Sequence, residues 1–259
     1  MLQVEQIAVR FGGVKALSDV SFTAESGAVT GLIGPNGAGK TTTFNVVTGL
    51  QRPMSGCVRF DGDDITRLSP QKRAKRGIAR TYQRLEVFGS LSVRDNVQVA
   101  VEVHGGWKAR RGARARADAL IEQVGLESVA DVTADLLPTG MARLVEVARA
   151  LATNPHLVLL DEVSSGLSGQ ETERLGELLS ALSRDGVAVL LVEHDMDLVM
   201  SVCTQLFVLD FGELISHGPP AVVQADPRVQ EAYLGTPSAP DISGEAPPPT
   251  SLGEWGATS

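Results

Sequence analysis

Nine consecutive residues near the start of the chain have the composition of a phosphate-binding loop. They contain the spacing G-x-x-x-x-G-K-T and are Gly34, Pro35, Asn36, Gly37, Ala38, Gly39, Lys40, Thr41 and Thr42. Glycines let a backbone wrap a phosphate without Cβ clashes, and the N–H groups at a helix start attract anions. Lys40 is expected to reach the β- and γ-phosphates, and the Thr41 hydroxyl to hold Mg²⁺. A glycine-rich turn is the simpler explanation, but the position between an apolar strand and a helix favours a nucleoside triphosphate site.

Two acidic residues and a histidine follow later apolar segments. Residues 157–160 lead directly into Asp161 and Glu162, and residues 187–192 end two positions before His194. Asp161 is expected to bind Mg²⁺, and Glu162 to act as the general base that polarises an attacking water. His194 is placed to contact the γ-phosphate or to orient that water. Acids at strand ends often cap helices, and single histidines are often structural, so these roles depend on the phosphate loop.

The elements that must position these residues alternate between strand and helix. Residues 29–33 predict a buried strand before the loop, and residues 41–48 predict a helix after it. A leucine stripe across residues 175–182 predicts a helix between two further buried strands, which implies a parallel sheet with right-handed crossovers. Carboxyl ends of parallel strands meet at one edge of a sheet, so the polar residues there converge on one triphosphate. Gln83, at the end of another expected strand, adds an amide suited to Mg²⁺ or to the water.

The remaining segments complete an α/β prediction. Strands are expected at residues 2–9, 20–23 and 56–60, helices across about 93–151, and a hairpin at 206–216. We predict a P-loop NTPase core with a mostly parallel sheet, an N-terminal antiparallel β subdomain, and a helical subdomain at about residues 84–152. One nucleotide-binding domain then spans residues 1–235. Residues 236–259 are rich in Pro, Gly and Ser and contain no Lys or Arg, so we expect a disordered tail.

Composition narrows the class of protein. The 259 residues are 43% hydrophobic and 21% charged, as in globular proteins, and a net charge of −8 does not favour nucleic acid as a partner. No uncharged apolar run approaches the roughly 20 residues that cross a bilayer, and the N-terminus lacks the apolar block of a signal peptide. Cys57 and Cys203 share no metal or redox spacing and are expected to be buried, reduced thiols. A cytosolic protein is expected, free or docked on a membrane partner.

In their order along the chain, these motifs resemble the ATP-binding subunit of ABC transporters. The likeness covers residues 1–235 and adds an aromatic Phe11, a signature segment at 137–141 and a turn at 165–168. It implies that Phe11 stacks on adenine and that the ligands are ATP and Mg²⁺. It also implies that Gly140, at a helix start in the signature segment, faces the γ-phosphate held by a second ATP-binding subunit. The reaction would transfer a phosphoryl group to water.

Further segments resemble importers of branched-chain amino acids. They are residues 11–17, 77–83, 87–93, 226–229 and 231–235. The resemblance implies that two ATP-binding subunits, alike or different, sit under a pair of membrane permease subunits at the cytoplasmic face of the cell membrane. A periplasmic or extracellular solute-binding protein is then an indirect partner, and residues 90–96 are the expected permease contact. Importers of urea, amides or other amino acids share this architecture, so the solute stays open.

Two segments depart from the family pattern. The signature segment reads Leu137-Pro138-Thr139-Gly140-Met141 in place of Leu-Ser-Gly-Gly-Gln. Pro138 offers neither a hydroxyl nor an N–H. In the turn after the acids, Val163 stands where Pro is usual, and Ser168 where Asp is usual. Because these changes fall on the surface offered to the partner's nucleotide, we hypothesise an asymmetric dimer whose two sites work at unequal rates.

Two other classes of protein stand as alternatives. A soluble ABC-type ATPase that acts on nucleic acid or ribosomes usually has two ATP domains or long coiled coils, whereas this chain has one domain, no sustained heptads and an acidic balance. A GTPase or small-molecule kinase is disfavoured because no Asn-Lys-x-Asp motif follows the phosphate loop. The basic residues within 108–116 could lie against anionic lipid, although a solvated helix face is the simpler explanation.

Overall fold

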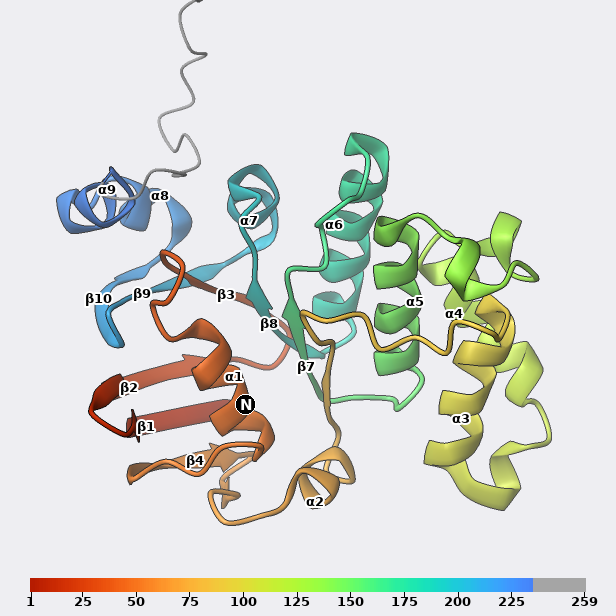
Figure 1. Cartoon of the computed structure of the whole chain (residues 1–259), viewed down its shortest axis with the longest axis horizontal. Coiled ribbons are helices and arrows are strands. Elements are labelled where there is room, and N and C mark those ends of the chain that lie inside the picture. The colour runs from red at the N-terminus through yellow and green to blue at the C-terminus, as the bar shows by residue number, and fades with distance from the viewer. Residues whose placement is uncertain (235–259) are drawn as a thin grey trace, which may run out of the picture.

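Two β-sheets organise the computed structural model, which describes residues 1–234 without the side chains of residues 107–109 (Figure 1). The central sheet has the order β10-β9-β3-β8-β7-β6 and consists of β3 (Val29–Ile33), β6 (Ile78–Arg80), β7 (Leu157–Asp161), β8 (Ala188–Val192), β9 (Gln205–Asp210) and β10 (Glu213–Gly218). Its strands pair in parallel except β10, which returns antiparallel to β9. The second sheet is antiparallel, with the order β2-β1-β4-β5, and consists of β1 (Leu2–Phe11), β2 (Val14–Ala24), β4 (Ser55–Phe60) and β5 (Asp63–Asp64).

Helices cover the central sheet and extend beyond one edge of it (Figure 1). They are α1 (Lys40–Thr48), α2 (Pro70–Ala74), α3 (Val93–Ala109), α4 (Ala113–Gln123), α5 (Thr139–Leu151), α6 (Gly169–Arg184), α7 (Met196–Val202), α8 (Pro220–Gln224) and α9 (Pro227–Leu234), with 3-10 turns at Glu127–Val129 and Ala134–Leu136. The elements α3, α4 and α5 form the expected helical subdomain. The predicted fold class is therefore confirmed.

Packing on both faces explains the continuous apolar sequence of the central strands. Every residue of β7 is buried. Val158 and Leu160 belong to the cluster formed with the α3–α6 helices, whereas Leu157 and Leu159 belong to the cluster formed with α1 and the antiparallel sheet. Successive side chains of a strand point to opposite faces, so one strand serves two cores. The carboxyl edge of the sheet is left for polar residues.

Helix α6 forms where the leucine stripe predicts it. Leu175, Leu178, Leu179 and Leu182 are its buried residues. Ser168 caps its N-terminus: the Ser168 hydroxyl accepts a hydrogen bond from the Glu171 N–H, and the Glu171 carboxylate accepts one from the Ser168 N–H. The serine that stands in place of the family's aspartate is thus still a helix cap.

Two expectations need correction. The strand before Gln83 ends at Arg80, because β6 pairs with β7 over three residues only, and Gln83 follows in an irregular segment. Cys203 is buried, and burial raises its pKa to about 12, but Cys57 is only half-buried on β4. Its thiol donates to the Glu5 carboxylate at 3.1 Å, an acceptor at the sheet surface that an apolar strand pattern does not reveal.

Several expectations lie outside the described part of the chain. The tail at residues 236–259 and the side chain of Lys108 belong there. Of the basic cluster, Arg111, Arg114 and Arg116 are exposed. Within residues 1–234 no helix combines the length and the hydrophobicity that crossing a bilayer requires.

Candidate active site

The phosphate loop connects β3 to α1, as expected. Gly34 and Gly39 have positive φ angles of 148° and 108°. A Cβ atom on Gly34 would lie 2.0 Å from the Leu209 carbonyl oxygen, and one on Gly39 would lie 2.9 Å from the Ala16 carbonyl oxygen. Both positions therefore need glycine, because β9 and β2 approach the loop backbone too closely for a side chain.

Lys40 is held at the loop by carbonyl oxygens. It is the first residue of α1 and is only 7% exposed. Its Nζ donates to the carbonyl oxygens of Gly34 at 2.5 Å and Pro35 at 3.0 Å. Burial lowers the pKa of Lys40 from its usual value, and the charges of Glu162 and Asp161 oppose that shift. A phosphate oxygen is a stronger, charged acceptor for the same ammonium.

The first turn of α1 presents its hydroxyl groups in different directions. Thr43 is buried, and its Oγ1 donates to the Gly39 carbonyl at 3.0 Å. Thr41 is exposed and Thr42 is half-buried, while Asn36 and Gly37 of the loop are exposed. Thr41 is therefore the hydroxyl that a bound ion can reach most directly.

Glu162, His194 and Gln83 meet at the carboxyl edge of the sheet. The Glu162 Oε1 lies 3.0 Å from His194 Nε2, and Gln83 Nε2 donates to Glu162 Oε2 at 3.2 Å. The side chains of His194 and Glu162 are 45% and 22% exposed. Glu162 has a φ of 52°, a left-handed conformation that is costly for a residue with a side chain. Three segments distant in sequence thus bring an acid, an imidazole and an amide together. The strand-end argument predicted this for Glu162 and His194, whereas Gln83 arrives from the irregular segment after β6.

Asp161 forms a buried ion pair that the sequence did not reveal. Its Oδ2 accepts from Arg80 Nη2 at 3.0 Å, and the two side chains are 1% and 5% exposed. Burial raises the pKa of Asp161, and the Arg80 guanidinium opposes this rise. Arg80 also donates to Asn45 Oδ1 at 2.6 Å and stacks over the Tyr82 ring at 5.1 Å. Nothing in the sequence indicated this role of Arg80, because its partner Asp161 is 81 positions away.

A second buried acid links the turn after Glu162 to the histidine strand. Glu193 is 3% exposed and accepts hydrogen bonds from both the Ser164 N–H, at 2.8 Å, and the Ser164 hydroxyl, at 2.6 Å. Burial raises the Glu193 pKa, and these hydrogen bonds oppose the rise. The sequence shows an acid, Glu193, directly before His194, but nothing in it indicates that Ser164 is the partner of this acid.

The remaining candidates, Gly140 and Phe11, lie on other elements, α5 and β1. Gly140, in the first turn of α5, packs closely on the turn at residues 165–168. A Cβ atom on Gly140 would lie 2.4 Å from the Gly166 carbonyl oxygen. Pro138 precedes α5 as its N-cap and provides no side-chain cap. Phe11 ends β1 opposite Val14 and is 52% exposed. Within residues 1–234 no hydrogen bond joins Gly140 or Phe11 to Glu162.

The C-terminal part of the fold supports the phosphate loop. In the β9–β10 turn, the Gly212 N–H donates to the Ala38 carbonyl at 3.0 Å. The Gly212 carbonyl accepts from the Ser18 N–H at 2.8 Å. Tyr233 on α9 is 5% exposed; burial raises its pKa to about 12, and a hydrogen bond with the Gly34 backbone opposes that rise.

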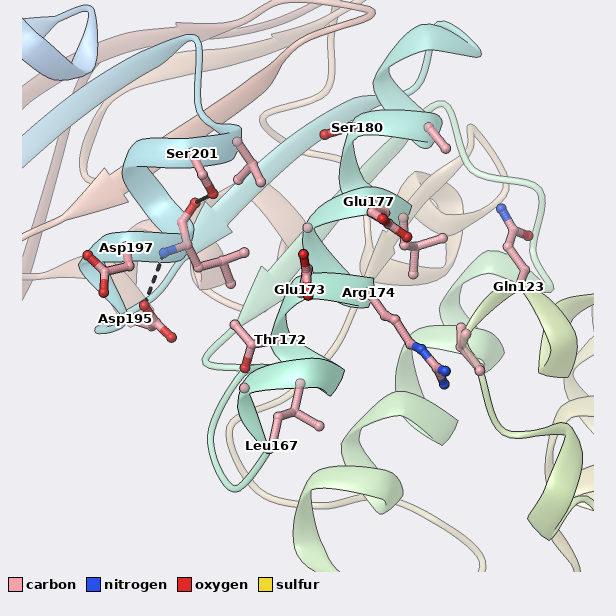
Figure 2. Close-up of a pocket in the computed structure, with 18 of the residues that line it drawn as sticks. Gln123, Leu167, Thr172, Glu173, Arg174, Glu177, Ser180, Asp195, Asp197 and Ser201 are labelled. Atoms are coloured by element: carbon pink, nitrogen blue, oxygen red, sulfur yellow. Dashed lines mark hydrogen bonds between the residues drawn. The ribbon is translucent and has the colours of Figure 1, made fainter.

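A separate groove of about 1270 Å³ lies between α6, α7 and the end of α4, away from the phosphate loop. Figure 2 shows Glu173 and Glu177 on α6 and Asp195 and Asp197 at the start of α7 along it. Asp195 caps α7 by accepting from the Leu198 N–H at 3.0 Å. One of these acids thus has a structural role.

Comparisons with known proteins match this architecture. The family model described as ABC transporter matches residues 17–165. BraF of Pseudomonas aeruginosa, a high-affinity branched-chain amino acid transport ATP-binding protein, is 37% identical over 249 residues, covering 91% of this chain and 98% of BraF. LptB of Escherichia coli, a lipopolysaccharide export system ATP-binding protein, is 36% identical over 234 residues, covering 90% and 97%.

Solved structures agree with the sequence relatives. The ADP conformation of MJ1267, an ATP-binding cassette of an ABC transporter, superposes with a TM-score of 0.80 at 30% identity, covering 91% of this chain and 99% of MJ1267. The cassette MJ0796, solved as a dimer in a post-hydrolysis state with ADP and Pi, gives 0.77 at 25% identity, covering 85% and 99%.

The chain therefore belongs to the ABC transporter family, as an ATP-binding cassette that hydrolyses ATP to drive transport. Within that family, a model described as branched-chain amino acid ATP-binding cassette transporter matches residues 213–239. The expectation of an ATP-binding subunit of an ABC transporter is therefore confirmed at the level of the family.

Proposed function

We propose that this chain energises an importer of branched-chain or related amino acids from the cytoplasmic face of the membrane. The match of residues 213–239 to the branched-chain amino acid model is the observation that carries this proposal, and the similarity to BraF over 91% of the chain supports it. We further propose that residues 1–235 act as one ATP-binding domain, with a helical subdomain at about residues 84–152. A solute-binding protein would deliver the solute to the permease, outside any contact with this chain.

In the proposed reaction, Glu162 is the general base for the attacking water. Its carboxylate is fixed by the two contacts described above, from His194 and Gln83. Both groups can hold the water or the γ-phosphate once ATP is bound. Lys40 and the backbone of the loop would bind the phosphates, and Phe11, exposed at the end of β1, would stack on the adenine ring. A positioned electrostatic group of this kind is worth on the order of 10²–10³ in rate.

The donors at the edge of the sheet fit Mg²⁺. Thr41 supplies a hydroxyl, Asp161 a carboxylate and Gln83 an amide oxygen, all hard oxygen ligands. No cluster of three or more His, Cys, Asp or Glu side chains suited to a metal occurs among residues 1–234. Mg²⁺ prefers hard oxygen ligands and is often held by one or two carboxylates together with substrate phosphates, a type of ligand that Thr41, Asp161 and Gln83 can supply. When bound, the ion would neutralise charge on the β- and γ-phosphates.

A second ATP-binding subunit would complete the site. The start of α5 presents N–H groups beside Gly140, and the helix dipole favours an anion there. Because Pro138 cannot contribute a hydroxyl, we keep the hypothesis of a dimer with unequal sites, formed with a like or a different chain. Equal rate losses from Glu162→Gln in this chain and from the equivalent change in the partner, measured one site at a time in the reconstituted complex, would refute it.

A groove of about 690 Å³ between α2, α3 and α5 is the proposed contact with a membrane subunit. Exposed apolar side chains line it: Leu50, Tyr82, Phe88, Val99 and Val103. Such a patch marks an interaction site, and a short amphipathic segment of a permease would fit it. Within the expected contact at residues 90–96, Val93 and Asn96 are completely buried, whereas Ser90 and Asp95 are exposed. Asn96 instead fixes the backbone of Phe88 through hydrogen bonds of 2.9 and 3.0 Å.

Lipopolysaccharide export is the second candidate function. The alignment with LptB of Escherichia coli spans 234 residues and covers 90% of the 259 residues, which is about 233, so it runs nearly without gaps. The alignment with BraF needs 249 positions to cover 91%, or about 236 residues. The scarcity of alignment gaps therefore favours an LptB-like chain, whereas the C-terminal family model favours amino-acid transport.

Uptake measurements in a strain that lacks this chain separate the two candidates. We expect the strain to lose uptake of labelled leucine or a related amino acid, and to regain it with the wild-type chain but not with Glu162→Gln. The purified variant Val103→Glu, changed in the groove, should still bind ATP. It should not restore uptake to the strain. Normal uptake of every amino acid tested, together with loss of lipopolysaccharide from the cell surface, would replace our proposal by the second candidate.

A further inference from the structure

The side chain of Arg73 is fully buried although it carries a charge. Arg73 lies on the short helix α2 and is 1% exposed. Burial lowers its pKa to about 10, so it remains protonated at neutral pH. A buried charge has to be matched by hydrogen-bonding partners. Its neighbours therefore show what this guanidinium is for.

All the hydrogen bonds of Arg73 go to backbone carbonyl oxygens. Its Nη1 donates to Val46 at 2.7 Å and to Val47 at 2.6 Å. Its Nη2 donates to Thr66 at 2.9 Å, and its Nε donates to Leu68 at 3.1 Å. Val46 and Val47 lie in the last turn of α1, where carbonyl groups lack partners within the helix and the helix dipole is negative. Arg73 is thus a cationic cap of α1, supplied from another helix.

The end of α1 is shaped around this guanidinium. Gly49 follows the helix with a φ of 81°, and a Cβ atom there would lie 2.8 Å from Arg73 Nε. The same Cβ would lie 3.0 Å from the Leu68 carbonyl oxygen, which Arg73 also uses. A side chain at position 49 would therefore displace the guanidinium. The two residues form one fitted contact.

Helix α1 connects this contact to the phosphates. It begins with Lys40 and has nine residues, which makes it about 13 Å long. Its N-terminus forms the phosphate site, and its C-terminus is held by α2. On its other side, α2 lines the 690 Å³ groove through Gln71, Ala74 and Lys75, and Arg73 itself lies in that wall. Thr48, the last residue of α1, also lines the groove. One short helix thus extends from the groove wall to the phosphate loop.

We propose that Arg73 is a positioning residue that ties the phosphate-loop helix to the groove wall. A membrane subunit seated in the groove then acts on Lys40 and Thr41 through α2, Arg73 and α1. This path does not pass through Gln83. The part that concerns the membrane subunit rests on the proposed function, whereas the part that concerns α1 does not.

A matched pair of basic-residue exchanges tests the proposal. Arg73→Lys keeps the charge but loses the planar fork that serves four carbonyl groups. Lys72→Arg, at an exposed neighbour on the same helix, is the control. In the purified chain we expect Arg73→Lys to weaken Mg-ATP binding about tenfold. The variant loses one or two of the hydrogen bonds that hold α1, and their free energy corresponds to a change in affinity of this size. Lys72→Arg should match the wild type. In the complex, Arg73→Lys should co-purify normally with the membrane subunits but lose most of their stimulation of ATP hydrolysis.

The outcomes separate the two proposals. Failure of the wild-type chain to co-purify with any membrane subunit would overturn the docking function, and the ATP affinity of the purified variants would still decide the role of Arg73. Wild-type affinity and wild-type stimulation in folded Arg73→Lys would overturn the coupling. Gly49→Ala, which keeps the guanidinium but displaces it, should reproduce the weaker ATP binding.

Hydrogen exchange of the wild-type chain provides a test that needs no variant. Binding of the membrane subunits should slow amide exchange across residues 40–49 as well as in α2. Protection confined to α2 and the groove would contradict transmission through α1.

Discussion

Replacing Arg80 by methionine is the sharpest test of how the catalytic edge is held together. The change removes one partner of an ion pair whose two side chains are 5% and 1% exposed, and it leaves the Asp161 carboxylate buried without its cation. Breaking a buried pair on one side costs about 3–5 kcal/mol. At about 2–4 °C of melting temperature per kcal/mol for a chain of this size, Arg80→Met should melt roughly 6–20 °C lower than the wild type. Thermal unfolding without nucleotide at neutral pH measures this difference.

Controls isolate the ion pair from general effects. Arg76→Met breaks an exposed pair with Asp63, 42% and 67% exposed, and should cost less than about 1 kcal/mol. Adding Asp161→Asn to Arg80→Met should recover part of the loss, because no buried charge is then left unpaired. Burial already raises the folded-state pKa of Asp161, and removing Arg80 raises it further. The deficit should therefore shrink on acidification, when Asp161 takes up a proton, and grow as pH rises. Equal destabilisation by Arg80→Met and Arg76→Met would refute the reasoning.

Three further changes probe the phosphate site and the signature turn. Glu162→Gln should lower the rate of ATP hydrolysis by on the order of 10²–10³ while ATP still binds, which single-turnover measurement and equilibrium binding can separate. Burial lowers the pKa of Lys40 from its usual value of 10.5, so its ammonium should lose its proton below that pH. The ATP affinity of the wild type should therefore fall as the pH rises toward 10.5. An affinity that does not change with pH would count against a contact between Lys40 and phosphate. Gly140→Ala places a Cβ atom 2.4 Å from the Gly166 carbonyl oxygen, so this variant should lose about 1–3 kcal/mol of stability by denaturant unfolding.

The sequence predicted those parts of the site that depend on local pattern. The loop at residues 34–42 has a spacing tied to one geometry, and apolar runs that end in polar residues place those residues at one edge of a parallel sheet. The meeting of Glu162 and His194 followed from that rule, without knowledge of any distance. Gln83 joins them from the irregular segment after β6, so its place there did not follow from a strand end. Their proposed roles still await the measurements above.

Partners separated widely along the chain could not be read in this way. Arg80 and Asp161 are 81 positions apart, and a basic residue at a strand end is normally solvated. Arg73 lies in the segment Lys72-Arg73-Ala74-Lys75-Arg76, whose composition is typical of an exposed helix. Its burial is explained by backbone carbonyl groups at the end of α1 and in the segment before α2, which the sequence does not reveal. Nor does a glycine in a sequence reveal which backbone approaches it, as Gly166 approaches Gly140.

The contact of the β9–β10 turn with the phosphate loop has a consequence for how members of this family differ. The region matched to the branched-chain amino acid model begins at Glu213, directly after the glycine whose N–H bonds to Ala38, and it continues to the tyrosine hydrogen-bonded to the Gly34 backbone. The matched portion thus contributes one side chain, that of Tyr233, to the support of the phosphate loop, and the Gly212 contact lies immediately before it. A graft of that portion that removes the Tyr233 hydroxyl should therefore lower ATP affinity, which equilibrium binding to the chimeric cassette would measure.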